Sequence, residues 1–160
     1  MTTTARIRRA TRDDLDVLGR LGAALMRAHY AYDPERFMAP GATPEKGYAR
    51  FLASQLDQAD AAIFVADHAG TVAGYVYAGI EPVSWKELRD ECGYVHDLVV
   101  DDNHRGHGIG TALMDAALAW MSERGVPRAV LCTAQRNERG QRLFEHLGFR
   151  RTMIEMTKEL

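Results

Sequence analysis

The sequence of 160 residues contains only two cysteines, Cys92 and Cys132, and they lie far apart. They can form neither a disulfide framework nor a four-ligand zinc site. His104 and His107 are three positions apart with no third ligand nearby, so we expect no metal. No apolar run approaches the roughly 20 residues that span a bilayer, and the polar start has no signal core. These absences predict a cytoplasmic protein without a membrane anchor.

The sequence also lacks an excess of charge of either sign. Its 20 basic and 22 acidic residues give a net charge of −2, so no global positive field favours nucleic acid or an anionic membrane. The apolar fraction of 46% is typical of globular proteins. A chain of this length forms about one domain, here residues 1–160, and buries roughly 70% of its unfolded surface. Composition alone does not separate an enzyme from a binding module.

Hydrophobic periods and turn signals predict a mixed α/β fold with the element order β α α β β β α β α β. Strands are expected over residues 5–10, 61–66, 71–80, 94–100, 129–133 and 151–158. The first helix is expected from Thr11 to about His29, and the second starts at Thr43-Pro44. A long helix should end at Gly125. Asn137 should cap a last helix that ends at Gly148, with Phe149 packing back on Phe144.

The segment Arg105-Gly106-His107-Gly108-Ile109-Gly110 joins a predicted strand to a predicted helix. Its glycines permit positive φ angles and close approach of a ligand, and the helix start supplies free N–H groups that favour phosphate. A Walker loop would need Lys after Gly110, where Thr111 stands instead. A dinucleotide site would need different glycine spacing and a later acid. The alternative is a plain turn that binds no ligand.

Two signatures resemble those of the GNAT family of N-acetyltransferases. Arg105-x-x-Gly108-x-Gly110 matches Arg/Gln-x-x-Gly-x-Gly/Ala, and residues 137–149 are similar to Asn-x-x-Ala-x-x-Phe-Tyr-x-x-x-Gly-Phe. The order of strands and helices agrees over nearly the whole chain. The resemblance implies one GNAT acetyltransferase domain. Its fold would be a central mixed, mostly antiparallel sheet with helices on both faces.

The resemblance further implies acetyl-CoA as co-substrate. The loop N–H groups would hold the pyrophosphate, and the preceding strand would pair with pantetheine. One strand N–H group, expected at Val99, would polarise the thioester carbonyl. The Asn137 side chain would contact pantetheine, serve as a helix cap, or do both. The cofactor-binding residues implied in this way are Leu98, Val99, Val100, Arg105, Gly106, His107, Gly108, Ile109, Gly110, Thr111 and Asn137.

A primary amine with a pKa near 10.4 is only about 0.04% neutral at pH 7, so transfer to it requires a proton acceptor or desolvation. The candidate base is Asp97, with His96 and Glu81 as alternatives. Because strand residues alternate, His96 and Asp97 are expected on opposite faces. The family often has a tyrosine as general acid where this chain has Phe144. Another donor, water, or release of the thiolate would then complete the reaction.

The expected acceptor is a small-molecule primary amine. The segment from Glu81 to Gly93 carries four carboxylates, which suit a cationic amine, although a solvated loop has the same composition. Within the family, a protein N-terminus or a lysine is the alternative acceptor. A CoA-binding sensor without activity and a nucleotide-binding protein are the alternatives outside catalysis. The resemblance also leaves open a homodimer in which the last strand takes part.

Overall fold

The computed structural model describes residues 4–160, so the first three residues of the expected domain lie outside it. A five-stranded sheet with the order β1-β2-β3-β4-β5 forms its centre. All neighbouring strands are antiparallel except β4 and β5, which are parallel. The strands are β1 (Arg6–Arg9), β2 (Ala61–His68), β3 (Thr71–Glu81), β4 (Cys92–Val100) and β5 (Ala129–Leu131). The predicted α/β class and the mostly antiparallel sheet are therefore present.

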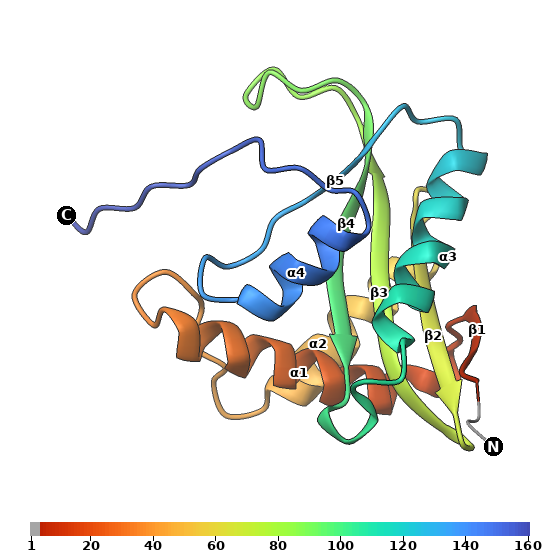
Figure 1. Ribbon diagram of the computed structural model, residues 1–160. Coiled ribbons are helices and arrows are strands. Elements are labelled where there is room, and N and C mark those ends of the chain that lie inside the picture. The colour runs from red at the N-terminus through yellow and green to blue at the C-terminus, as the bar shows by residue number, and fades with distance from the viewer. Residues whose placement is uncertain (1–3) are drawn as a thin grey trace.

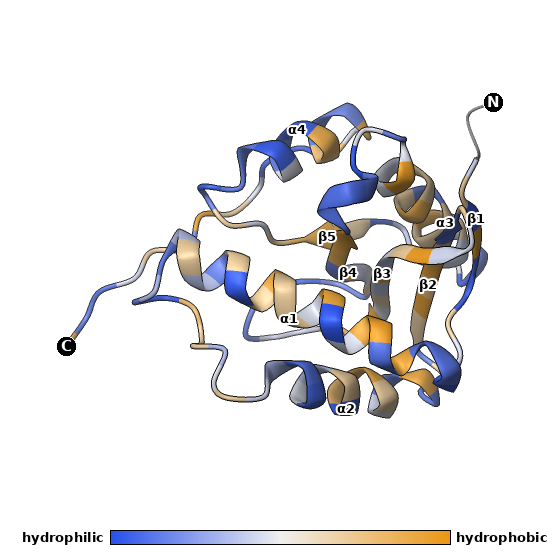
Figure 2. Ribbon diagram, turned by 90° about the horizontal axis from the view of Figure 1, so that it is seen from below, coloured by the Kyte–Doolittle hydropathy of each residue, from blue (hydrophilic) through white to orange (hydrophobic). Residues whose placement is uncertain are grey.

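Helices cover both faces of the sheet (Figure 1). One face packs against α1 (Leu15–Tyr32) and α2 (Pro44–Leu56), and the other packs against α3 (Ile109–Glu123). The fourth helix, α4 (Glu138–His146), lies beside the short strand β5. Seen from below, the sheet runs between these two helical layers, and orange apolar stretches of α1 and α3 adjoin it (Figure 2). Each layer buries its own hydrophobic core against the sheet.

Helices α1 and α2 approach each other closely because α1 has glycine where they meet. A Cβ atom on Gly19 would lie 2.5 Å from the carbonyl oxygen of Glu45. A Cβ atom on Gly22 would lie 2.0 Å from Cδ1 of Tyr48. Both distances are too short for real carbon atoms, so the helix pair requires glycine at these positions unless a neighbour moves. This contact fixes where the Tyr48 side chain enters the protein.

The end of α4 confirms the predicted cap. Gly148 has a φ angle of 91°, and the Phe149 N–H group donates to the carbonyl oxygen of Phe144 at 2.9 Å. The two phenyl rings lie 6.1 Å apart in an edge-to-face arrangement. The chain therefore turns back on itself and covers α4 with Phe149, as a Schellman-type ending requires.

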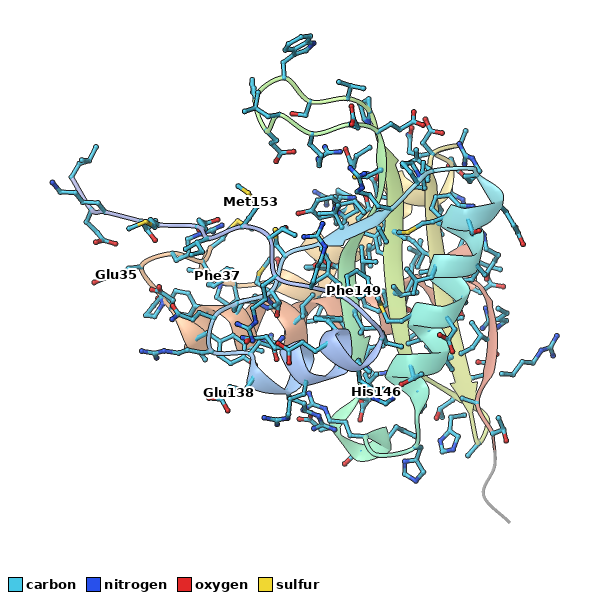
Figure 3. All side chains as sticks on the ribbon, turned by 45° about the horizontal axis from the view of Figure 1, so that its top comes forward. Glu35, Phe37, Glu138, His146, Phe149 and Met153 are labelled. Carbon is cyan, nitrogen blue, oxygen red and sulfur yellow. The ribbon has the colours of Figure 1, made fainter. Side chains whose placement is uncertain are left out.

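The predicted last strand over residues 151–158 is wrong. The chain beyond α4 has no regular element, and residues 151–160 are exposed. An alternating pattern forms a strand only when a neighbouring strand satisfies its backbone, and β5 is three residues long and pairs with β4 alone. The tail instead passes over the loop after α1, where Arg36 Nη2 donates to Glu155 Oε2 at 2.9 Å. Figure 3 shows Met153 of the tail close to Phe37 of that loop.

The part of the chain from residue 4 onward contains no helix both long and apolar enough to cross a membrane.

Candidate active site

Strands β4 and β5 diverge at one edge of the sheet. Strand β5 pairs only with residues Gly93 to Val95 of β4. From His96 to Val100, the edge of β4 therefore has no strand partner among the residues that the structure describes. A cleft of about 50 Å³ opens where the two strands separate. Its lining residues are Leu25, His29, Val95, His96, Asp97, Leu98, Leu131, Cys132, Thr133, Asn137 and Phe144.

A β-bulge in β4 turns both base candidates toward the same face. Tyr77 of β3 pairs with Asp97, but the next residue, Ala78, pairs with Val95, so His96 is an extra residue in β4. The His96 ring stacks on Tyr77 at a centroid distance of 4.7 Å, and Asp97 bonds to Tyr75 on that same face. The prediction that His96 and Asp97 point to opposite faces is therefore wrong, because the inserted residue interrupts the alternation.

Asp97 is a buried carboxylate held by two tyrosines. Tyr48 of α2 and Tyr75 of β3 donate hydrogen bonds to its Oδ2 atom at 2.8 and 2.9 Å. Only 9% of the residue surface is exposed, and burial raises the pKa of Asp97 while the two hydrogen bonds oppose that rise. Burial and the neighbouring carboxylate raise the pKa of both tyrosine hydroxyls as well. The hydroxyls are therefore protonated donors at neutral pH.

His96 and Glu81 form a separate pair. The Nε2 atom of His96 lies 3.0 Å from Oε1 of Glu81, and the imidazole ring is stacked between Tyr77 and Tyr94. His96 lines the cleft, whereas Glu81 lines a separate groove formed by residues of the β3–β4 connection. Of the three predicted base candidates, His96 and Asp97 line the cleft. Glu81 does not line it and contacts His96 instead.

The hydrogen bonds of β4 show which N–H groups face the open edge. The Asp101 N–H group donates to the carbonyl oxygen of Ala73 on β3 at 2.8 Å. Because N–H directions alternate along a strand, the Val99 N–H group also faces β3, and those of Leu98 and Val100 face the open edge. This alternation is at odds with the expectation that Val99 polarises the thioester carbonyl, and it favours Leu98.

The glycine loop forms an open turn in front of α3. Gly106 and Gly108 have φ angles of 80° and 73°, and a Cβ atom on either would meet no heavy atom within 4 Å. Gly108 immediately precedes α3, so the N–H groups at the start of that helix, from Ile109 to Thr111, have no carbonyl partner within the helix. The buried Ile109 side chain anchors the turn in the core. Such a turn suits an anion.

Arg105 and His107 of the loop direct their side chains to nearby groups of the same turn. Arg105 pairs with Asp102 at 2.6 Å, and His107 Nδ1 lies 3.1 Å from the carbonyl oxygen of His104. Over residues 4–160, no three His, Cys, Asp or Glu side chains gather closely enough to hold a metal ion. Because the Arg105 and His107 side chains already contact groups of the turn, the backbone N–H groups are the donors that the loop leaves available to an anion.

Asn137 lines the cleft and caps α4. Its Oδ1 atom accepts from the Gly140 N–H group at 3.1 Å, which confirms the predicted cap, and its Nδ2 atom donates to Thr133 Oγ1. Phe144 of α4 also lines the cleft, and its side chain has no polar atom. The second predicted signature thus forms the wall opposite β4.

Sequence reasoning missed two residues near this cleft. Cys132 falls inside the strand predicted over residues 129–133, but it is exposed, lines the cleft, and lies 3.0 Å from the Tyr94 hydroxyl. Its strand ends at Leu131, one residue earlier, so the burial expected of a strand interior is lost. Tyr48 of α2 is the second such residue, and its hydroxyl bonds to Asp97. No spacing in the sequence links it to Asp97, which is 49 positions away.

Comparison with known proteins places this geometry in a family. The sequence model described as the Acetyltransferase (GNAT) family matches residues 23–149. The chain belongs to the GNAT family of acetyltransferases. An uncharacterised N-acetyltransferase of Archaeoglobus fulgidus is 33% identical over 147 residues, which cover 91% of this chain and 92% of that protein.

Two further similar proteins carry names that mention a small molecule. A mycothiol acetyltransferase of Propionibacterium freudenreichii is 33% identical over 142 residues, which cover 86% of this chain but only 40% of that longer protein. The aminoglycoside N-acetyltransferase AAC(6')-Iy, solved in complex with CoA, superposes with a TM-score of 0.76. It is 17% identical, and the match covers 100% of this chain and 97% of that one. The predicted GNAT fold is thereby confirmed, and the chain is a GNAT N-acetyltransferase.

Proposed function

We propose that this GNAT acetyltransferase moves the acetyl group of acetyl-CoA to a primary amine of a small molecule. The observation that supports this most directly is the divergence of β4 from β5. It brings an open row of strand N–H groups and the Asp97 carboxylate into one cleft. Acyl transfer to an amine needs both, because the carbonyl oxygen gains negative charge while the amine loses protons.

Acetyl-CoA fits the residues that surround the cleft. The pantetheine arm would extend along Leu98, Val99 and Val100 as an added strand, since the open edge of β4 presents the backbone groups of an unpaired strand. The pyrophosphate would lie on the turn from Arg105 to Gly110 and against Thr111. Asn137 would contact pantetheine from the opposite wall while it caps α4.

In the proposed mechanism, Asp97 accepts a proton from the substrate ammonium, directly or through one water. The neutral amine attacks the thioester carbonyl, and the Leu98 N–H group stabilises the charge that develops on the carbonyl oxygen. The carbon–sulfur bond then breaks, and the acetylated amine releases its remaining extra proton to solvent. Raising the carboxylate pKa by burial makes Asp97 a stronger proton acceptor than an exposed aspartate.

The leaving sulfur takes no proton from Phe144, since a phenyl ring has none to give. A thiol with a pKa of about 8.5 is a tolerable leaving group in its thiolate form, so we propose that CoA leaves as thiolate or is protonated by water. The active site therefore works with a base and without a tyrosine acid at this position.

The acceptor class rests on the cleft and on the family members compared above. The acceptor amine would enter the cleft beside Asp97, which lines it. The Glu81 carboxylate beside His96 favours a cation near the cleft, and the segment from Glu81 to Gly93 carries four carboxylates against Lys86 and Arg89. The names of the mycothiol and aminoglycoside acetyltransferases also refer to small molecules and not to proteins.

The test is release of free CoA thiol from acetyl-CoA across polyamines, aminoglycosides, amino acids and peptides. We expect turnover with at least one cationic small molecule and a loss of about 10²- to 10⁴-fold in Asp97→Asn. Asp115→Asn, on the exposed side of α3, is the matched control and should keep full activity. Acetyl-CoA binding in a thermal-shift assay without thiol release for any amine would favour a sensor. Turnover restricted to peptides would instead favour a protein acceptor.

A further inference from the structure

We propose that Tyr48 and Tyr75 form a clamp that holds one oxygen of Asp97 and thereby presents the other oxygen to the acceptor amine. In this arrangement, Tyr48 and Tyr75 are positioning residues and Asp97 Oδ1 is the basic atom. The inference rests on the proposed function for the identity of the proton that Oδ1 accepts. The clamp itself stands on contacts that need no substrate.

Both tyrosine hydroxyls converge on the same carboxylate oxygen. Tyr48 reaches it from α2 at 2.8 Å and Tyr75 from β3 at 2.9 Å. Within residues 4–160, no donor bonds to Oδ1, although Asp97 lines the cleft. An ionised carboxylate has about four lone-pair positions, so a fully structural carboxylate would share its bonds between both oxygens. The observed bonds fix the side chain at Oδ2 and leave Oδ1 for another donor.

Packing alone does not explain these polar atoms. Tyr75 is completely buried, and a phenylalanine would fill almost the same space without a hydroxyl to satisfy. Burying the Asp97 carboxylate also costs free energy, which hydrogen bonds offset only in part. Two tyrosines and one carboxylate are thus buried together where three apolar side chains would be more stable. Such an arrangement is typical of a site whose chemistry requires a charged group.

The Tyr48 arm of the clamp depends on the space that Gly22 leaves in α1. The Tyr48 ring fills that space and packs edge-to-face on Phe51 at 5.9 Å. The ring therefore has one direction in which to extend, and its hydroxyl ends at Asp97. A clamp built from two packed aromatic rings on separate elements restrains the carboxylate more firmly than flexible side chains would.

The clamp also sets the proton affinity of Asp97. Burial raises the pKa of Asp97, whereas hydrogen bonds from Tyr48 and Tyr75 stabilise the ionised form and lower it. The other titratable groups near the carboxyl are His29 from α1 and His96 from β4, which lower the pKa when charged, and Tyr77 from β3. Removing either clamp hydroxyl should therefore raise the pKa of Asp97 further and leave less carboxylate ionised at neutral pH.

The experiment compares Tyr48→Phe and Tyr75→Phe with Tyr77→Phe as the matched control. Tyr77 lies on β3 two residues after Tyr75, but its hydroxyl donates to Gln55 Oε1 at 2.9 Å and not to Asp97. Two quantities are measured: the acidic limb of the pH dependence of kcat, and the titration of the Asp97 carboxyl carbon by NMR. Either clamp variant should move both toward higher pH by about one unit. We expect kcat to fall about tenfold, the KM for acetyl-CoA to stay constant, and the Tyr77→Phe titration to match the wild type.

The NMR titration requires no turnover, so it separates the two proposals. If no amine is acetylated but the clamp variants shift the Asp97 titration, the clamp stands and the proposed function fails. The clamp is overturned if Tyr48→Phe titrates like the wild type, or if Tyr77→Phe shifts as far. Tyr48→Phe decides the result should Tyr75→Phe fail to fold, because Tyr48 is less completely buried than Tyr75.

Discussion

The ring of Tyr48 on α2 fills the space that a side chain on Gly22 of α1 would need, since a Cβ atom on Gly22 would lie 2.0 Å from Tyr48 Cδ1. The hydroxyl of the same tyrosine bonds to Asp97 in the cleft. Gly22 does not line the cleft, yet it determines whether a cleft carboxylate keeps its partner. The contact between the first two helices is therefore linked to the geometry of the proposed base.

Replacing Gly22 by alanine should push the Tyr48 ring out of its place and cost about 1–3 kcal/mol of stability, as overpacking usually does. Activity should fall with it, because Asp97 loses a hydrogen bond. Gly47→Ala on α2 is the matched control, since its Cβ would meet no atom within 4 Å. It should stabilise the helix by up to about 1 kcal/mol. Urea denaturation and kcat measure both effects, and equal stability of the two variants would contradict the prediction.

Asp97→Asn should raise stability at pH 7 while it removes activity. The pKa of Asp97 is higher in the folded chain than in the unfolded chain, so ionisation of this group destabilises the fold as pH rises through the folded pKa. Asparagine avoids that cost, and its oxygen still accepts from the two tyrosines. The gain should disappear below about pH 4, where aspartate is protonated in both states. Thermal unfolding between pH 3 and pH 8 provides the measurement; a variant less stable than the wild type at pH 7 would refute this account.

Gly108→Ala should weaken CoA binding about tenfold, because a left-handed backbone costs a non-glycine residue roughly 1–2 kcal/mol and the strained turn would shift its N–H groups. A Cβ atom at Gly108 would meet no protein atom within 4 Å, so the strain within the protein is confined to the backbone. Gly125, with a φ angle of 77° after α3, is the control. Its alanine variant should lose similar stability and bind CoA normally in a calorimetric titration. Equal loss of CoA affinity in both variants would count against the loop as the phosphate site.

Proline substitutions distinguish the two edges of β4. Leu98→Pro removes an N–H group that faces the open edge, so the ladder to β3 stays complete and kcat should fall by about 10²- to 10³-fold. Val99→Pro removes an N–H group that faces β3 and should unfold the protein or cost about 3 kcal/mol. Leu98→Ala controls for the lost side chain. Circular dichroism and thiol release supply the readouts, and a stable, active Leu98→Pro enzyme would exclude this N–H group as the oxyanion donor.

Much of the fold is predictable because its signals are local. Asn137, Gly148 and Phe149 specify the start and end of α4 through contacts within a few residues, and the structure has them. The glycine turn is equally local. The predicted tail strand over 151–158 failed for the opposite reason, since alternation describes one chain segment and a strand requires a partner elsewhere.

The active-site geometry was less predictable because it depends on one extra residue and on distant contacts. Nothing in the sequence marks His96 as the extra residue of a β-bulge, although this bulge puts His96 and Asp97 on one face. Tyr48 looks like any aromatic on an apolar helix face until α1 and α2 pack. The sequence thus indicates which residues can react and leaves their mutual orientation to the folded chain.

The open edge of β4 affects how the protein should be handled. The backbone groups of residues 96–100 that face away from β3 are a template for an extended peptide, including the same segment of another molecule. A bound CoA would cap that template. Preparations without the ligand should therefore aggregate sooner on storage and on concentration than preparations saturated with it, and the same molecule would act as both co-substrate and solubilising additive.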